Sequence, residues 1–287
     1  MTESVQEAPA GSAEQLPPEA PGEPGIVIRA ADALIAIPVN FFAEIGVVAS
    51  LLGQALFWGI RRPYRVRLWI DAMDFIGVGS IFIVGLTGLF IGMVFGIQLV
   101  DGFRQFGAEN QVGAVVGLAL TRELAPVFSA LMVSSRAGSA MTTEIGSMRV
   151  TSQIDALTTM AVNPVQYLVV PRIIAGTLMV PLLTMLFNLI GIFGAWIICV
   201  KVLALDSGVF IDKVRWYVDL EDLNQGLIKA VVFGFTIALI ACRQGFYASG
   251  GAAGVGRATN RSVVHSAVAI LILDYIVTSL ITGQGGL

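Results

Sequence analysis

Five long apolar segments dominate the pattern of hydrophobic and polar positions along this chain. Two of them lie close together, at about residues 75–100 and 112–133. After a polar stretch, a longer apolar segment covers about residues 167–203, and two more cover about residues 227–242 and 263–280. A helix of about 20 apolar residues is long enough to cross a bilayer. The pattern therefore predicts an all-α integral membrane protein with five transmembrane helices.

The first 62 residues do not follow this pattern. Residues 1–25 are rich in Pro, Glu and Ala and hold almost no large apolar residue, which predicts a disordered cytoplasmic tail. Residues 26–62 are apolar but interrupted by charged side chains, so they lack the uncharged stretch of about 20 residues that a span needs. They predict an amphipathic helix lying in the membrane interface, with a shallow or re-entrant span as the alternative. Residues 63–287 then form the transmembrane bundle.

The composition also indicates a multi-pass membrane protein. Of the 287 residues, 56% are hydrophobic and 13% are charged, whereas soluble domains carry about 25% charged residues. The two cysteines, Cys199 and Cys242, both lie in apolar segments and lack the spacing of metal ligands. We therefore predict no disulfide framework and no metal site.

Basic residues are unevenly distributed between the connectors on the two sides of the predicted spans. The side richer in Lys and Arg is normally cytoplasmic, which predicts a cytoplasmic N-terminus and an external C-terminus. The same alternation favours one long kinked helix over two half-spans for residues 167–203, because a split would break it. An acidic loop, residues 206–222, lies on the external side. The basic connectors hold Arg61, Arg62, Arg65, Arg67, Arg136, Arg149, Arg172, Arg243, Arg257 and Arg261.

Four ionisable residues fall inside predicted spans, where a charge costs about 2.5–3.5 kcal/mol on insertion scales. Arg122 and Glu123 lie in the second span, Lys229 early in the fourth and Asp274 midway along the fifth. Two charges of each sign can form a structural ion-pair network. Alternatively, they line a polar part of a substrate cavity or take part in gating. The adjacency of Arg122 and Glu123 favours the second interpretation, because helix neighbours point about 100° apart and cannot face one partner.

A polar stretch, residues 134–163, connects the second and third spans. Thr151 or Ser152 can cap a short helix there whose first turn holds Asp155, and this helix must end before Pro164. Its apolar residues recur at three-residue spacing, which predicts an amphipathic helix on the cytoplasmic side. Such a helix either rests on lipid headgroups or docks into a groove of a motor subunit. The recurring residues are Ile154, Leu157 and Met160.

Glycine spacing and missing motifs add two expectations. Gly88, Gly92 and Gly96 recur at spacing four in the first span, which predicts the close approach of another helix. No G-x-x-x-x-G-K-[ST] phosphate loop occurs, and the glycine-rich linker before the last span resembles one only superficially. If ATP drives this protein, ATP and Mg²⁺ bind to a partner ATPase. No Ser/His/Asp triad is apparent either, so we predict no enzymatic activity and no cofactor on this chain.

Six segments of the sequence resemble the MlaE-type (YrbE) permeases, the membrane subunits of ABC lipid transporters that work with MCE-domain proteins. The resemblance runs from about residue 41 to the end of the chain and excludes the acidic tail. The segments that carry it are GLFIGMVFGIQL (88–99), TRELAPV (121–127), SRAGSAMTTEIGSMRVTSQIDAL (135–157), VNPVQYLVVPR (162–172), GLIKAVVFG (226–234) and GVGRATNRSVVHSAVAILILDYIVTSL (254–280).

The resemblance implies an architecture and a set of partners. Such permeases form a homo- or heterodimer in the bacterial inner membrane, with an N-terminal interfacial helix, five spans and a cytoplasmic N-terminus. A cytoplasmic ABC ATPase docks on each protomer through the helix between spans two and three, and MCE-domain proteins lie on the outer side. The cargo is a phospholipid or a related membrane lipid, and no nucleic acid is bound. The implied permease domain covers residues 26–287.

The resemblance also implies roles for individual residues around a lipid cavity at the dimer interface. Phe106 stands where some members carry Tyr near the cavity mouth. The residues implied to line the cavity are Phe95, Leu99, Phe103, Phe106, Arg122, Glu123, Lys229 and Asp274. The residues implied to couple to the ATPase are Glu144, Thr151, Gln153, Ile154, Asp155, Leu157 and Met160.

Two other functions compete with this interpretation. An ion-coupled secondary transporter would use Glu123 and Asp274 as proton or sodium sites. Such carriers typically contain paired repeats with broken helices, and five spans do not divide into equal halves. A non-transporting scaffold of an envelope complex is the third hypothesis, and it predicts that neutralising Arg122 or Glu123 leaves function intact.

Overall fold

A computed structural model describes residues 46, 50–59, 61 and 65–284 of the chain. Residues 50–59 are helical. The predicted tail and most of the predicted interfacial helix lie outside the described residues. All regular secondary structure in the described part is helical, as the sequence predicts.

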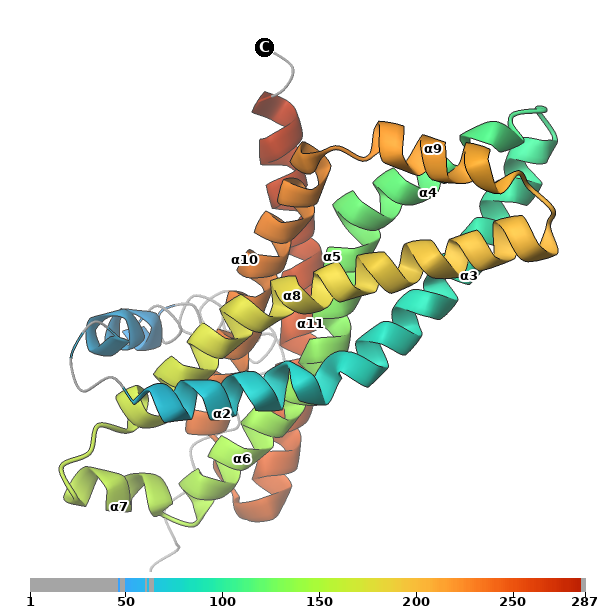
Figure 1. The fold of residues 1–287 in the computed structure, drawn as a ribbon. Helices are drawn as coiled ribbons and strands as arrows, with labels where there is room; N and C mark the ends of the chain where they lie inside the picture. The colour runs from blue at the N-terminus through green and yellow to red at the C-terminus, as the bar shows by residue number, and fades with distance from the viewer. Residues whose placement is uncertain (1–45, 47–49, 60, 62–64, 285–287) are drawn as a thin grey trace, which may run out of the picture. The chain divides into compact units, whose positions relative to one another are not determined.

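Five helical runs in the described part are long and apolar enough to cross a membrane, which confirms the five-span prediction. Figure 1 shows that several runs join more than one helical element end to end. The five runs are Val66–Arg104, Glu109–Val150, Val165–Val202, Leu220–Phe246 and Gly251–Ile281. The elements are α2 (Val66–Ile76), η1 (Val78–Ser80), α3 (Ile81–Arg104), η2 (Glu109–Gln111), α4 (Val112–Ala119), η3 (Leu120–Leu124), α5 (Ala125–Val133), η4 (Ser134–Gly138), α6 (Ser139–Val150), α7 (Gln153–Thr159), η5 (Val165–Val169), α8 (Val170–Trp196), η6 (Ile197–Val202), α9 (Ser207–Tyr217), α10 (Leu220–Phe246) and α11 (Gly251–Gln284).

Three segments predicted as connectors contain more helix than the sequence predicts, so the predicted ends of the adjoining spans were wrong. The second span continues through η4 and α6 to Val150, well beyond residue 133. The acidic loop, residues 206–222, contains α9 and the first turn of α10, and the glycine-rich linker is the start of α11. Small and hydroxyl-bearing residues lower the apolarity of a segment, but they do not end a helix that tertiary packing supports.

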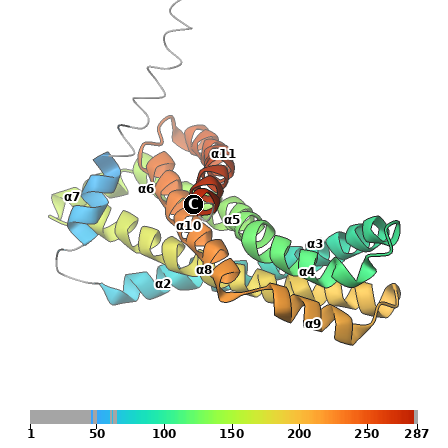
Figure 2. The same cartoon turned by 90° about the horizontal axis from the view of Figure 1, so that it is seen from above.

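The third span is one continuous run of η5, α8 and η6, with Pro181 inside α8. This confirms the prediction of a single long helix over two half-spans. α8 is the central packing partner of the bundle, because α3 packs along one side of it and α10 along another (Figures 1 and 2). α10 in turn packs against α6 and α11, and α9 packs against α4.

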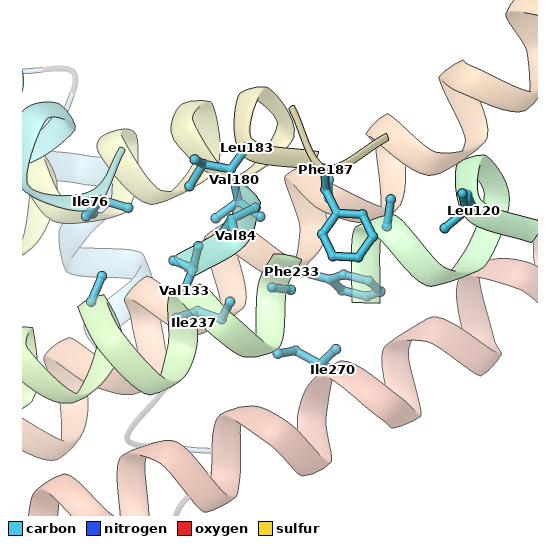
Figure 3. Packing of buried hydrophobic residues seen from close by; sticks show 14 of the residues in the cluster. Ile76, Val84, Leu120, Val133, Val180, Leu183, Phe187, Phe233, Ile237 and Ile270 are labelled. Atoms are coloured by element: carbon cyan, nitrogen blue, oxygen red, sulfur yellow. The ribbon is translucent and has the colours of Figure 1, made fainter. Parts of the chain in front are cut away.

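The apolar core lies where these helices meet (Figure 3). Phe187 of α8 and Phe233 of α10 are fully buried there, and Phe187 stacks on Phe128 of α5 with a centroid distance of 6.4 Å. Ile270 of α11 is also fully buried. The core therefore draws on the second to fifth spans, and Val84 of α3 adds the first.

Close contact between α3 and α8 depends on residues without side chains. A Cβ atom added at Gly92 would collide with the carbonyl group of Gly191. A Cβ added at Gly88 would lie 3.1 Å from the carbonyl oxygen of Phe187, and one at Gly96 would lie 3.1 Å from Cys199 Sγ. The three glycines of the first span thus all face α8, and the two backbones approach as closely as small residues allow.

The break between α2 and α3 is held by Arg136 of η4. Its guanidinium donates a hydrogen bond to the carbonyl oxygen of Phe75 and lies 4.8 Å from the centre of the Phe75 ring. A Cβ added at Gly79 would collide with this guanidinium. The last carbonyl groups of a helix have no hydrogen-bond donor within that helix. At the end of α2, Arg136 of the second span supplies a donor for the Phe75 carbonyl.

A polar seam joins α6 to α10 and α11. The hydroxyl oxygen of Thr142, which is fully buried, lies 3.0 Å from the carbonyl oxygen of Gly138 and 3.1 Å from that of Ala241. It also lies 2.9 Å from Ser262 Oγ. This seam explains why the polar residues after position 133 stay helical, because their hydroxyl groups find partners on neighbouring helices.

Replacing Thr142 with Val should destabilise the bundle by about 1–3 kcal/mol, because it leaves buried polar partners unsatisfied without changing the shape of the side chain. The matched control is Thr143→Val, since Thr143 is exposed and its hydroxyl bonds to Ser139 and Thr259 at the surface. The measurement is thermal unfolding of both variants in the same detergent. Equal unfolding temperatures for the two variants would contradict this account of the seam.

Candidate functional site

Three of the four intramembrane charges meet in one cluster. The ammonium group of Lys229 on α10 contacts Glu123 Oε2 of η3. It also lies 3.1 Å from Asp274 Oδ1 of α11, as an ion pair without the angle of a hydrogen bond. The Lys229 side chain is 2% exposed, and a buried ammonium needs such carboxylate partners. Lys229 thus ties the second, fourth and fifth spans together.

The fourth charge, Arg122, pairs with a residue that the sequence analysis did not single out. Its Nε atom lies 2.6 Å from Oδ1 of Asp222, which is 3% exposed. The other carboxylate oxygen of Asp222 accepts a hydrogen bond of 3.0 Å from the backbone N–H of Asp219. The signal that could have revealed Asp222 is the Asp-x-x-Asp pattern before an apolar run, which is typical of a helix start.

The two ion pairs form because η3 and α10 are in backbone contact. A Cβ atom added at Gly226 would collide with the carbonyl oxygen of Thr121. Gly226 lies between Asp222 and Lys229 on α10, and η3 is a π-helical turn, a feature that is frequent at functional sites. The missing side chain lets the polar residues on either side reach Arg122 and Glu123.

Arg122 and Glu123 face different partners, as expected of helix neighbours, but this does not exclude a structural network. Both side chains reach the same helix, because their partners Asp222 and Lys229 are seven residues apart on α10. Adjacent charges are compatible with a structural network. The cluster still has one open side, since the Arg122 and Glu123 side chains are 46% and 43% exposed.

The predicted aromatic lining of the cavity lies on another helix interface. Phe95, Leu99 and Phe103 share one face of α3 and are half-buried against the core. Phe106, just beyond α3, is 83% exposed. α3 packs mainly on α8, whereas the charged cluster lies between η3, α10 and α11. A single chain therefore presents the two sets of predicted cavity residues on separate helix interfaces.

The predicted coupling helix is α7, which lies at the end of the bundle opposite to α9 (Figure 1). The prediction of a hydroxyl cap was wrong. Ser152 occupies the N-cap position with a φ of 59° and no capping hydrogen bond, and the Thr151 hydroxyl donates back to the carbonyl of Ser147 at 2.8 Å. The left-handed residue turns the chain directly from α6 into α7. Asp155 lies in the first turn as predicted, where its carboxylate pairs with Arg149 at 2.8 Å.

Some residues of α7 are buried against the bundle, and others are exposed. Ile154 is 2% exposed, and Leu157 is half-buried against the same apolar cluster. Thr151, Gln153 and Asp155 are exposed, and Met160, immediately after the helix, is 64% exposed. The apolar residues fix α7 to the bundle, and the exposed ones leave a surface for a partner.

Glu144 forms an ion pair with Arg172 of the same chain, and its own side chain is 56% exposed. Its Oε2 atom lies 2.8 Å from Arg172 of α8, whose side chain is 13% exposed and also donates to the carbonyl of Leu168 at 2.8 Å. Both residues line a cavity of about 360 Å³ between α2, α6 and the start of the third span. The pair links the helix that leads into α7 to the third span.

A sequence model described as permease MlaE matches residues 69–280, which contain the second, third and fourth runs and nearly all of the first and fifth. The chain belongs to the MlaE permease family. It is 39% identical over 86% of its length to the intermembrane phospholipid transport system permease protein MlaE of Haemophilus influenzae, of which the match covers 95%.

Other relatives of the chain are named as probable ABC transporter permeases. A probable ABC transporter permease protein of Rickettsia typhi is 39% identical over 85% of this chain and 94% of its own length. Another, from a Synechocystis strain, is 39% identical over 84% of this chain and 91% of its own length. This MlaE-family chain is therefore a multi-pass transport subunit rather than an enzyme, in agreement with the prediction.

Proposed function

We propose that this chain is the permease subunit of an ATP-driven ABC transporter that moves phospholipid, or a related lipid, between the bacterial inner membrane and an MCE-protein conduit. The observation that carries the proposal is the family match over residues 69–280, together with 39% identity to a phospholipid transport permease over 86% of the chain. The permease itself supplies the lipid path, and ATP and Mg²⁺ bind to the partner ATPase.

The ATPase docks at α7 in this proposal, which makes the basic end of the bundle the cytoplasmic end. The N-terminus is proposed to be cytoplasmic as well. Support comes from Gln153 and Asp155 on α7 and from Met160 just after it, which are exposed while Ile154 and Leu157 hold α7 to the bundle. Glu144 transmits movement of α6 to the third span through its ion pair with Arg172.

The lipid cavity forms between two protomers, and MCE-domain proteins bind on the side of α9. α11 carries Asp274 of the charged cluster and exposes Leu271, Ile272 and Tyr275 beside it. A second protomer covering this face would join the aromatic stripe of α3, with Phe95 and its neighbours, to the open side of the cluster. Arg122 and Glu123 then contact the polar part of the lipid.

The charged cluster gives less support to an ion-coupled carrier. Lys229 places its ammonium group between the carboxylates of Glu123 and Asp274. A sodium ion bound here would need the same position, because the carboxylate oxygens would have to coordinate it and neutralise its charge. The geometry therefore favours a fixed polar patch over a transported-ion site.

Met160→Asp should reduce the amount of ATPase that co-purifies with the tagged chain by about tenfold or more, the effect of losing an apolar hot spot of about 2 kcal/mol. The matched control is Ser249→Asp, which adds the same charge at an exposed position between α10 and α11. The measurement is quantitative mass spectrometry after purification in mild detergent. Equal recovery of the ATPase with both variants would place docking away from α7.

A further inference from the structure

We propose that the groove between α8, α9 and the start of α10 binds one phospholipid, with an acyl chain along α8 and the phosphate at Arg215. This site differs from the cavity at the dimer interface, and the proposal does not depend on the transported cargo. α9 runs back along the end of α8 in both views of the bundle (Figures 1 and 2).

The groove has two lobes with a shared wall. One lobe, of about 450 Å³, lies between α8 and α9 and is lined almost entirely by apolar side chains. The other, of about 390 Å³, lies between α8, η3 and the α9–α10 junction. Leu189 and Ile192 line both lobes, so the two lobes are neighbours along α8. Each volume is in the range of about 300–1,000 Å³ that small-molecule sites have.

An unpaired cation lies beside this apolar lining. Arg215 of α9 lines the first lobe and is exposed, and no described carboxylate lies within ion-pair distance of its guanidinium. A guanidinium matches the geometry of a phosphate group in a bidentate way. An apolar groove with a free guanidinium at its side has the two features that a phospholipid requires.

A second polar group in the groove also lacks a partner. Asn188 lines the second lobe, is 6% exposed, and its side-chain oxygen has no hydrogen-bond partner among the described residues. A buried amide oxygen without a partner costs about 1–3 kcal/mol. The oxygen itself is covered by protein atoms, so the phosphate contact in this proposal rests on Arg215 and not on Asn188.

The residues around the groove are of the kinds found where a protein crosses the membrane–water interface. Trp216 is 81% exposed and Tyr217 is 42% exposed on α9, while Lys201 lies 5.5 Å from the centre of the Trp196 ring. Tryptophan, tyrosine and basic residues are enriched where the hydrocarbon core meets the headgroups. This position favours a lipid of the adjacent leaflet over a soluble ligand.

The test is quenching of Trp196, which lines the first lobe, by a phospholipid with brominated acyl chains. The full-length chain carries Trp58→Phe, Trp69→Phe and Trp216→Phe, so that Trp196 is the remaining tryptophan. Phosphatidylglycerol is added in substoichiometric to excess amounts in detergent. We expect saturable quenching, with a half-saturating concentration about tenfold higher in Arg215→Gln, as expected for one charge-assisted hydrogen bond.

Lys213→Gln is the matched control, because Lys213 is on the same helix but stacks on Tyr217 and does not line the groove. It should change the half-saturating concentration less than about twofold, because its charge does not contact the groove. Equal quenching by brominated diacylglycerol, which has no phosphate, overturns the proposal. If quenching is lost in the assembled transporter, the proposal is also overturned, because a partner protein and not a lipid then fills the groove.

Discussion

Lys229→Met is expected to destabilise the protein by about 3–5 kcal/mol and to abolish lipid transport, because it leaves Glu123 and Asp274 without their shared cation in the membrane interior. The stability loss lies toward the lower end of this range, since the Glu123 side chain is 43% exposed and partly solvated. Thermal unfolding in detergent measures the first effect. Lipid transfer between vesicles measures the second.

A neutral cluster separates the structural role of these charges from a role in transport. The triple variant Lys229→Met, Glu123→Gln, Asp274→Asn removes the unpaired carboxylates and should recover most of the unfolding temperature that Lys229→Met loses. We expect its lipid transfer to stay low, because the open side of the cluster has lost the negative charge of Glu123. Transfer at the wild-type rate in the triple variant would mean that the cluster only holds the helices together.

Gly92→Leu is expected to have the second large effect, because the new side chain would occupy the space of the Gly191 backbone on α8. α3 and α8 would have to separate along their contact, and overpacking of this kind costs about 1–3 kcal/mol or more. The variant should unfold at a markedly lower temperature and lose transport together with stability. Thermal unfolding and size-exclusion chromatography measure the change.

Gly102→Leu is the matched control for this prediction. Gly102 lies on the same helix as Gly92, but a Cβ atom there meets no other atom within 4 Å. It should leave the unfolding temperature nearly unchanged. A loss of stability in Gly102→Leu as large as in Gly92→Leu would attribute the effect to helix propensity or to lipid contact instead of α3–α8 packing.

The sequence was sufficient to predict the five spans because each contains an apolar stretch long enough to cross a bilayer. It was not sufficient to predict how far the helices extend. η4 and α6 look like a connector in the sequence, and they remain helical because Thr142 and Arg136 find partners on other helices. Such partners come from distant parts of the chain, so local composition does not reveal them.

The charged residues of the site could be identified from the sequence, because a charge in a membrane span costs free energy. The sequence did not show which of them pair. Asp222 looks like part of an acidic loop in the sequence, and only the contact at Gly226 brings it and Lys229 against η3. The local sequence pattern also does not predict where this cluster lies relative to the stripe of Phe95, Leu99 and Phe103. In our proposal a second protomer joins the two surfaces.

The most direct test of the proposed function is phospholipid transfer by the purified transporter in vesicles, with ATP and an ion gradient supplied separately. The complex is isolated through the tagged permease, reconstituted, and loaded with a fluorescent phospholipid. We predict transfer that requires hydrolysable ATP and Mg²⁺ and is insensitive to proton or sodium gradients. Transfer driven by a gradient without ATP would contradict the assignment and favour an ion-coupled carrier.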